Sequence, residues 1–289
     1  MPVSSIIQEH FGEVFRSGQF EDIYRLTSNE FQQLVPLNEF VDLSASFNEG
    51  VDHYNLEFKN AFLNFVNYVW IDDQREKAIN VTFDKDHQKI QGLFLKPYIK
   101  YTDSDNILTQ NKYMMPVKGE WFVFWGGTNE FMNYHYVYEN QRYAYDLVKV
   151  KDGLSYQDTP THNENYYAFG GEIVAPANGR VVKVVDGMID NIPGEMDPDH
   201  PAGNYVMIEH ANEEYSLLAH LKKDSITVKV GDDVKEGQGI GTCGNSGNSS
   251  EPHLHFHIMD SDDLEKGKSI RIQFRDGYEP IQGDTVFNE

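Results

Sequence analysis

The chain of 289 residues contains a single cysteine, few basic residues and no long apolar run. One cysteine, Cys243, excludes an intrachain disulfide and any cysteine-rich metal site. The formal net charge of −22 argues against nucleic acid and anionic membranes as partners, because phosphate contacts need basic patches. No stretch approaches the roughly 20 apolar residues of a membrane-spanning helix. With 39% hydrophobic and 13% aromatic residues, the composition instead predicts globular domains with packed cores.

The start of the sequence also shows no pattern of an export signal. The first fifteen residues lack the basic and apolar regions of a secretory signal peptide. Localisation therefore stays open: the protein either remains inside the cell or is exported under a signal that this chain does not carry.

The length predicts about two domains. Residues 1–98 contain helical patterns first and alternating apolar patterns afterwards, which predicts a small α+β accessory domain with helices packed on an antiparallel sheet. The first helix is expected to begin at Ser4 or Ser5, and Pro36 is expected to interrupt the helical region.

Residues 99–111 are polar and form the expected junction, and residues 112–289 form the second domain. Short strand patterns with turn residues about every ten positions predict an all-β antiparallel domain. Residues 187–204 are rich in Pro, Gly and Asp, so we expect a surface loop beside the functional site.

Three histidines occupy alternate positions of one apolar segment, His253, His255 and His257 in "HLHFHI". In a β-strand, residues two apart share a face and lie about 6.6 Å from each other. The apolar residues between them would then fill the core face. A row of imidazoles on the opposite face indicates a metal or catalytic edge, or a solvated surface.

Histidine and aspartate are suitable ligands for a hydrolytic zinc site. Zinc in such sites takes about three protein ligands and leaves a position for water, whose pKa falls from about 15.7 towards about 7. A second group of His and Asp residues should therefore precede the final histidine strand. Two segments contain one, "NYHYVYENQRYAYD" at residues 133–146 and "SLLAHL" at residues 216–221.

A family resemblance covers about residues 112–260. The segments "GGEIVAPANGRVV", "NYVMIEHANEEYSLLAHL" and "ITVKVGDDVKEGQGIGTCGNSGNSSEPHLHFHI" resemble the lysostaphin-type (LytM-like) zinc metallopeptidases. This resemblance implies a β-sheet scaffold, a Zn²⁺ cofactor and hydrolysis of peptide bonds in bacterial peptidoglycan. Residues 1–98 are similar, more weakly, to small cystatin-like or nuclear-transport-factor-like domains. Such domains usually bind or pack, so this domain is expected to mediate protein or wall binding.

The family pattern is His-x-x-x-Asp, then a histidine in an Ala-His-Leu-like strand, then His-x-His. Carried onto this chain, the resemblance implies that Asp146 and His255 are metal ligands. It implies that His220 and His253 are the catalytic pair outside the ligand set. One of two neighbouring histidines can bind metal while the other transfers a proton or stabilises the oxyanion.

The chain departs from the pattern at the first ligand, where Arg142 stands four residues before Asp146. A guanidinium has no lone pair to give to zinc. His135 is the nearest upstream replacement, and it would reach Asp146 if residues 135–138 and 142–146 formed neighbouring strands. His162 is a competing third ligand, and loss of the site is the remaining alternative.

Two further residues were assigned supporting roles. Arg142 shares strand parity with Asp146, so we expect it to orient His135 or to bind a substrate carboxylate bidentately; a structural salt bridge is the alternative. His257 stands where relatives often carry Glu, and it is expected to fix the tautomer of a neighbouring histidine or else to be a surface residue.

The sequence therefore predicts a zinc-dependent endopeptidase, with His135, Asp146 and His255 as ligands and His220 and His253 as catalytic residues. Its expected substrates are the stem peptides or cross-bridges of peptidoglycan. The alternative is an inactive module that binds peptidoglycan or a partner hydrolase and has lost its first ligand. Retention of the other four family positions favours the enzyme. A third possibility, a metal-storage or carbohydrate-binding domain, would require that His220 and His253 have no catalytic role.

Overall fold

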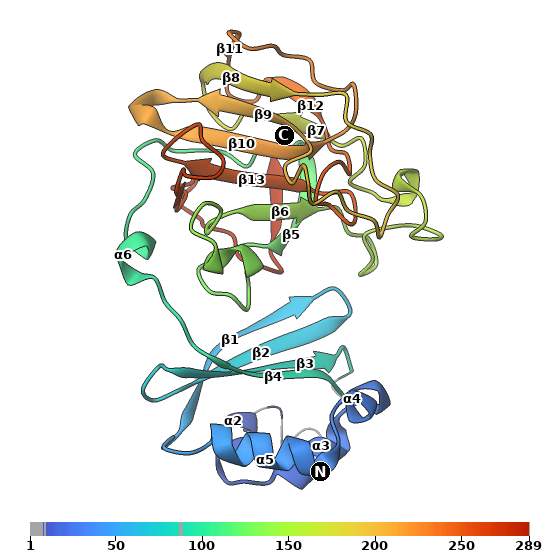
Figure 1. The fold of residues 1–289 in the computed structure, drawn as a ribbon, viewed down its shortest axis with the longest axis vertical. Coiled ribbons are helices and arrows are strands. Elements are labelled where there is room, and N and C mark those ends of the chain that lie inside the picture. The colour runs from blue at the N-terminus through green and yellow to red at the C-terminus, as the bar shows by residue number, and fades with distance from the viewer. Residues whose placement is uncertain (1–7, 9, 87–88, 289) are drawn as a thin grey trace. The chain divides into compact units, whose positions relative to one another are not determined.

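The computed structural model describes residue 8, residues 10–86 and residues 89–288. The chain separates into two compact units, Met1–Ile99 and Lys100–Glu289 (Figure 1). Ser4 and Ser5, the expected start of the first helix, lie outside the described residues. None of the described helices is both long and apolar enough to cross a membrane.

The first unit contains helices followed by an antiparallel sheet, so the predicted α+β class is confirmed. The helices are α2 (Phe11–Arg16), α3 (Phe20–Leu26), α4 (Asn29–Leu34) and α5 (Leu37–Phe47), and the strands are β1 (Tyr54–Phe62), β2 (Phe65–Asp72), β3 (Lys77–Asp84) and β4 (Ile90–Pro97). The strands pair in chain order. Pro36 caps α5 in an extended conformation, which explains why the helical region breaks there.

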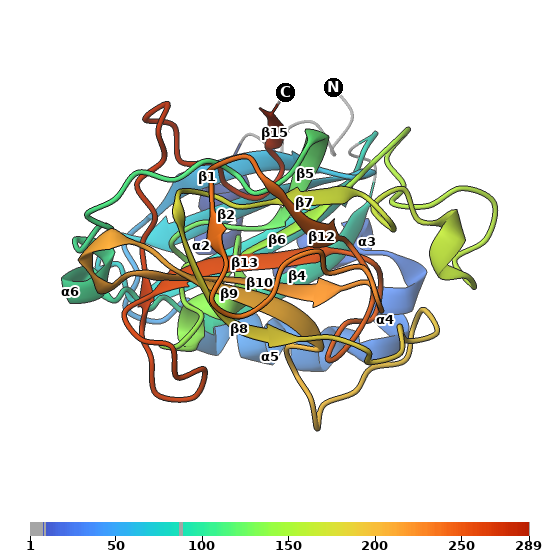
Figure 2. The ribbon, with the colours of Figure 1, turned by 90° about the horizontal axis from the view of Figure 1, so that it is seen from above.

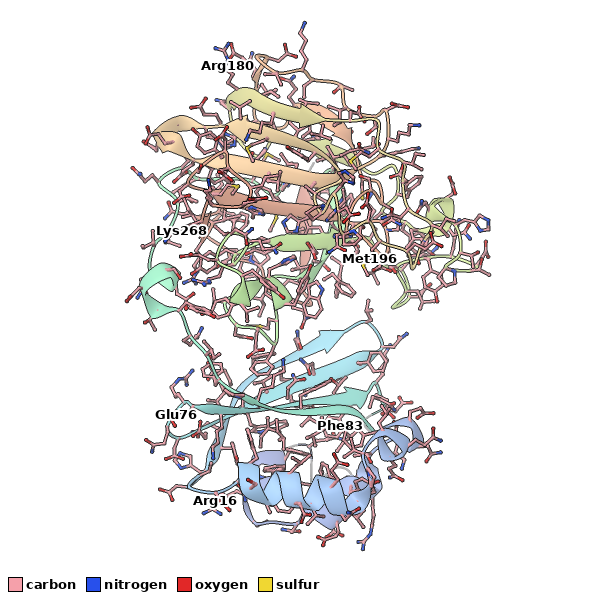
Figure 3. The ribbon with its side chains drawn as sticks, in the orientation of Figure 1. Arg16, Glu76, Phe83, Arg180, Met196 and Lys268 are labelled. Carbon is pink, nitrogen blue, oxygen red and sulfur yellow. The ribbon has the colours of Figure 1, made fainter. Side chains whose placement is uncertain are left out.

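Aromatic side chains fill the layer between the helices and the sheet of this unit (Figure 3). The ring centroids of Phe11 and Trp70 lie 5.1 Å apart, and those of Phe15 and Tyr54 lie 5.8 Å apart in an edge-on arrangement. The resemblance of this unit to cystatin-like or nuclear-transport-factor-like domains stays a prediction.

The second unit is built on one large antiparallel sheet, as predicted. The strands are β5 (Gly119–Trp125), β6 (Tyr145–Val148), β8 (Gly179–Val185), β9 (Asn204–Glu209), β10 (Tyr215–Leu221), β11 (Asp233–Val234), β13 (Leu254–Met259), β14 (Ser269–Ile270) and β15 (Thr285–Asn288). Their order is β11-β8-β9-β10-β13-β6-β5-β15, with β14 beside β13. Strands β7 (Glu172–Val174) and β12 (Gly239–Thr242) form a separate small sheet.

Strand β13 lies inside the large sheet between β10 and β6 (Figures 1 and 2). Its alternating apolar residues Leu254, Phe256 and Ile258 are fully buried in the core of the unit, as the alternation predicts. The same core contains Cys243, whose thiol pKa is raised by burial. The histidines of β13 therefore belong to the opposite face of the sheet.

The expected junction, residues 99–111, belongs to the second unit except for Ile99, which ends the first. It includes the short helix α6 (Thr102–Asp105), and the main-chain carbonyl of Asp105 accepts a hydrogen bond from Arg271 Nη1 at 2.8 Å.

Candidate metal centre

The strands of the large sheet bring four predicted site residues together. His255 of β13 is paired directly with Asp146 of β6, and on its other side with Ala219 of β10. His220 is the next residue of β10, and His253 immediately precedes β13. Three neighbouring strands thus position four of the five residues of the predicted centre.

His135 lies on a short 3₁₀ turn, η1 (Tyr134–Val137), rather than on a strand. Asn133 caps this turn by accepting a hydrogen bond from the His135 main-chain N–H at 3.1 Å. Its amide group also donates to the carbonyl oxygens of Arg142 and Ala144, at 3.3 and 3.0 Å. The turn is therefore fastened to the segment that leads into β6.

The expected strand pair at residues 135–138 and 142–146 is wrong. Residues 139–143 form turns, and β6 begins only at Tyr145. The Asn133 side chain takes up the carbonyl groups that a strand pair would have used. The contact between His135 and Asp146 nevertheless exists.

Asp146 is hydrogen-bonded by two imidazoles, one on each carboxylate oxygen. His135 Nε2 lies 3.0 Å from Oδ2, and His255 Nδ1 lies 2.9 Å from Oδ1. One ligand atom from each residue lies within 4.8 Å of the others, and all three residues are buried. Two imidazole nitrogens and one carboxylate oxygen form a donor set of the kind that zinc takes in proteins, so this cluster could hold a metal ion.

Electrostatics favour an ionised Asp146 and a neutral His255, the forms that metal ligands need. Burial by itself would raise the pKa of Asp146, but the charge interactions with His135 and His253 hold that pKa well below its usual value. Burial lowers the pKa of His255, and it lowers the pKa values of His220 and His257 further.

The rings of His220 and His253 lie beside each other, with centroids 4.6 Å apart. His220 Nδ1 donates to the Ser246 carbonyl at 2.8 Å, and His253 Nδ1 donates to the Glu251 carbonyl at 2.8 Å. A carbonyl oxygen can only accept, so the proton of each neutral ring is on Nδ1 and Nε2 carries the lone pair. His253 Nε2 lies 3.8 Å from Asp146 Oδ1, which places a proton acceptor beside the cluster.

His220 is aimed by an irregularity at the end of β10. The pairing of β10 with β9 shifts between Leu218 and Leu221, and His220 has a φ of 63° in the left-handed region. Its main-chain N–H donates to Ala202 of the loop 187–204 at 3.1 Å instead of to β9. Such a bulge re-aims a side chain at the end of a strand, and no feature of "SLLAHL" indicated it.

Arg142 is buried but does not lie on a strand, so the argument from strand parity is wrong. Its Nε donates to the Tyr136 carbonyl at 3.0 Å and its Nη1 donates to Ser104 Oγ at 2.9 Å. The guanidinium lies over the ring of Tyr101, with 3.6 Å from its carbon to the centroid. Arg142 thus contacts the turn that carries His135. It does not line the cavity beside the cluster.

Asp105 completes this support, and no pattern in the sequence indicated this role. Its two carboxylate oxygens accept hydrogen bonds from Tyr136 and Tyr143, at 2.8 and 2.9 Å. Because Tyr136 follows His135 directly, the short helix α6 helps to hold the turn as Asn133 does.

The other predicted residues differ in their surroundings. His257 Nδ1 lies 2.9 Å from His255 Nε2, and His257 is only 3% exposed, which agrees with a role behind the ligand rather than on the surface. His162 is exposed and bonded to Thr161, away from the cluster. His210 is buried between Asn178 and Ser216.

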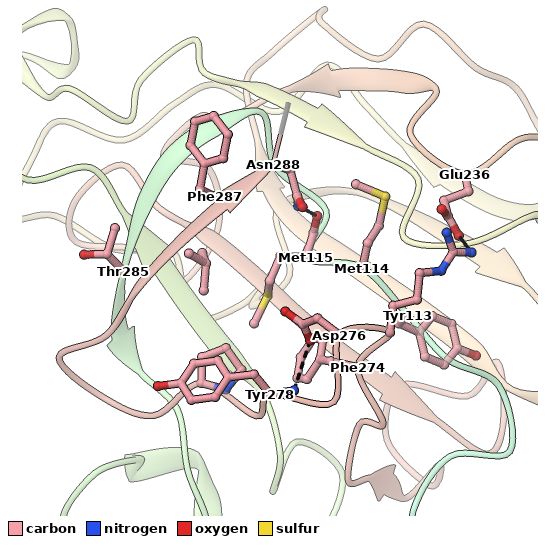
Figure 4. A pocket seen from close by; sticks show the side chains of 13 residues that line it. Tyr113, Met114, Met115, Glu236, Phe274, Asp276, Tyr278, Thr285, Phe287 and Asn288 are labelled. Carbon is pink, nitrogen blue, oxygen red and sulfur yellow. Dashed lines mark hydrogen bonds and ion pairs between the residues drawn. The ribbon is translucent and has the colours of Figure 1, made fainter.

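Two cavities of the second unit differ in whether predicted site residues line them. One, of about 270 Å³, is lined by His135, His220, His255 and His257, and by Pro201 and Ala202 of the loop 187–204. The loop therefore lies beside the predicted site, as expected. The other, of about 360 Å³, lies between β15 and residues 113–115 and 274–280 (Figure 4), and none of the predicted site residues lines it.

Comparison with known proteins identifies a family for part of the chain. The model of peptidase family M23 matches residues 164–271, a range that includes His220, His253 and His255 but begins after His135 and Asp146. The assignment of those two residues therefore depends on the structure.

Two curated relatives are similar over about a third of the chain. The peptidoglycan DD-endopeptidase ShyA of Vibrio cholerae is 41% identical over 91 residues, which are 30% of this chain and 21% of that protein. Lipoprotein NlpD of Yersinia enterocolitica is 39% identical over 101 residues, 35% of this chain and 84% of that sequence. The chain thus spans about a fifth of the first relative and most of the second.

Among solved structures, the catalytic domain of lysostaphin from Staphylococcus simulans is 26% identical, covering 40% of this chain and 85% of that domain, with a TM-score of 0.25.

Proposed function

Because the chain belongs to peptidase family M23, we propose that it is a zinc-dependent endopeptidase that cleaves peptide bonds in peptidoglycan stem peptides or cross-bridges. The observation that carries this proposal is the buried cluster of His135, Asp146 and His255, with the lone pair of His253 Nε2 beside it. The peptidoglycan substrate is proposed by analogy with relatives such as the peptidoglycan DD-endopeptidase ShyA.

His135 Nε2, one oxygen of Asp146 and His255 Nδ1 would hold the metal, and they match in kind and number the protein ligands of a catalytic zinc site. Zn²⁺ bound there supplies Lewis-acid chemistry, polarising a carbonyl group and lowering the pKa of water.

The other two histidines move the proton. The lone pair at Nε2 of His253 or His220 takes a proton from the attacking water, since Nδ1 of each ring is already protonated and bound to a carbonyl. The N–H that results donates to the developing oxyanion or returns the proton to the leaving amine. Both rings are held by main-chain carbonyls, so their Nε2 atoms are oriented before substrate arrives.

The alternative function is an inactive module that binds peptidoglycan or a partner hydrolase. The arginine at position 142, in place of the family histidine, favours that alternative. His135 weighs against it, because its imidazole lies 3.0 Å from Asp146 Oδ2 and completes a buried cluster of three groups that could hold a metal ion.

The proposal is tested by measuring zinc per chain with elemental mass spectrometry and by following muropeptide release from purified peptidoglycan. We expect about one zinc per chain and cleavage that a chelator abolishes and one equivalent of zinc restores. Bound zinc without cleavage, together with sedimentation on intact sacculi, would support the binding module instead. A protein that takes up no zinc after reconstitution would contradict the enzyme.

Substitution of Arg142 by alanine is expected to weaken zinc binding without removing a ligand. The turn that carries His135 would lose its bond at the Tyr136 carbonyl and the stack on Tyr101. Outer partners of metal ligands typically contribute 10–100-fold in affinity, so we expect a loss of about that size in a chelator competition assay. Arg180→Ala, at an exposed arginine of β8, is the matched control. A lower melting temperature with unchanged zinc affinity would make Arg142 purely structural.

A further inference from the structure

A chain of side-chain hydrogen bonds lies behind the ring of His253, on the side away from Asp146. Nδ1 of His253 faces two oxygen atoms, the Glu251 carbonyl at 2.8 Å and Ser249 Oγ at 3.1 Å. Ser249 Oγ lies 2.7 Å from Asn245 Oδ1. Ser249 is 1% exposed and Asn245 is fully buried, so solvent competes little for these bonds.

The direction of each bond in this chain is set by the main-chain carbonyl of Asn191, which can only accept. Asn163 Nδ2 donates to it at 2.7 Å, so Asn163 Oδ1 is the atom that accepts from Asn245 Nδ2 at 3.0 Å. Asn245 therefore presents Oδ1 to Ser249, whose hydroxyl group donates to it. A lone pair of Ser249 Oγ then accepts from His253 Nδ1–H. Every donor points away from the imidazole and towards the loop 187–204.

Three segments that are distant in the sequence contribute to this hydrogen-bond chain. Asn163 begins the 3₁₀ turn η2, and Asn191 belongs to the loop 187–204. Ser249 belongs to the segment that precedes β13, and its main-chain carbonyl accepts a bond from Asn191 Nδ2 at 3.0 Å. The position of Ser249 Oγ therefore depends on two loops outside the strand that follows it.

We propose that Ser249 and Asn245 are positioning residues for His253, which hold its imidazole so that the Nε2 lone pair stays directed at the attacking water. This inference rests on the proposed function, because it needs His253 to transfer a proton. A reactive side chain keeps its orientation when surrounding hydrogen bonds lock its rotamer. A second acceptor at Nδ1 restricts rotation of the ring, which a single N–H bond to the Glu251 carbonyl allows.

The two acceptors of His253 Nδ1–H differ in how they are held. The Glu251 carbonyl lies two residues before the histidine and moves with the same turn. Ser249 Oγ is joined through Asn245 to Asn163, which lies far from the turn in the sequence. The serine therefore ties the ring to the surrounding loops, and its removal should affect turnover rather than metal binding.

Ser249→Ala removes the second acceptor and leaves the Glu251 carbonyl in place. We expect kcat for muropeptide release to fall about tenfold, the equivalent of about one hydrogen bond, while KM and zinc content stay within about twofold of native. Ser250→Ala, at the exposed serine that follows in the chain, is the matched control and should have the native kcat.

Variants combined with His253→Ala separate a positioning role from a merely structural one. If Ser249 acts through His253, then Ser249→Ala should lower the remaining kcat of His253→Ala by less than about twofold. Asn245→Ala should lower the native kcat in the same direction as Ser249→Ala. The two substitutions together should cost little more than the larger single loss, because both residues belong to one chain of bonds.

Exchange of the His253 ring proton with water gives a readout that needs neither zinc nor activity. We expect a protected Nδ1–H resonance in the proton NMR spectrum of the native zinc-free protein. In Ser249→Ala this proton should exchange about tenfold faster, because one of its two acceptors is gone. The Nδ1–H of His220, which donates to the Ser246 carbonyl, is the internal control and should exchange at the native rate.

Three results would overturn the inference: a native kcat in Ser249→Ala, an equal further loss of kcat in the His253→Ala background, or unchanged exchange of the His253 ring proton. Each can occur in a protein that holds zinc and cleaves peptidoglycan normally. Absent zinc or absent cleavage in the native protein would contradict the proposed function instead. The exchange measurement would still decide whether Ser249 holds the ring.

Discussion

His135→Ala is expected to lose its zinc and, with it, all cleavage of peptidoglycan. The substitution would remove one of the three proposed ligand atoms and leave only those of Asp146 and His255, fewer than a zinc site takes. The loss in zinc affinity should exceed the roughly 10–100-fold that removal of an outer partner costs. Elemental mass spectrometry after identical reconstitution measures it directly.

The matched control for this prediction is His162→Ala, because His162 is the competing ligand and is exposed. Its zinc content should equal that of the native protein. Full zinc in His135→Ala would show that another group is the third ligand, and loss of zinc in His162→Ala would identify it. Circular dichroism of both variants checks that the sheet has formed.

His253→Ala should have the opposite pattern, with zinc retained and turnover lost. General acid–base groups contribute about 10²–10⁴-fold, so we expect kcat/KM for muropeptide release to fall by that factor. The kcat/KM of His220→Ala should fall within the same range. The decrease in kcat/KM of the double variant should be much smaller than the product of the two single decreases, because residues that transfer the same proton act as a unit.

Zinc content separates the possible outcomes for these variants. A His253→Ala protein that loses its metal would make His253 a ligand rather than a base, a reading that its distance of 3.8 Å from Asp146 Oδ1 does not favour. Unchanged kcat/KM in both single variants would make the histidines idle, and the hydrolytic mechanism would then be wrong.

The final histidine strand could be predicted from the sequence because its information is local. Alternation with period two assigns the residues of β13 to two faces, and burial of Leu254 and Phe256 follows from it. The pairing of His255 with Asp146, which are 109 residues apart, came only through the family resemblance. No pattern within either segment specifies that partner.

The surroundings of His135 were predicted incorrectly even though its contact with Asp146 was expected. Strand propensity in "NYHYVYENQRYAYD" suggested a hairpin, but the Asn133 side chain makes the bonds that close a turn. Asp105 lies in a stretch expected to be a junction, and its partners Tyr136 and Tyr143 follow 31 and 38 residues later. Contacts between distant segments decide such features, and local composition does not report them.

The tautomers of His220 and His253 were also beyond the sequence. They depend on the main-chain carbonyl oxygens of Ser246 and Glu251. These oxygens lie in the segment before β13 and accept hydrogen bonds from Nδ1 of His220 and His253. The motif indicates that histidines stand there, but only the structure indicates which nitrogen of each is free.

The attachment of His135 to a turn rather than to the sheet has a kinetic consequence. Asp146 and His255 lie in the hydrogen-bonded ladder of β6 and β13, and they separate only if that ladder breaks. The turn η1 is held chiefly by one asparagine and by the α6 contacts, so it can open by itself at a smaller free energy than global unfolding. Exchange of the ion with the medium would then proceed at the rate of this local opening, while the strands stay folded.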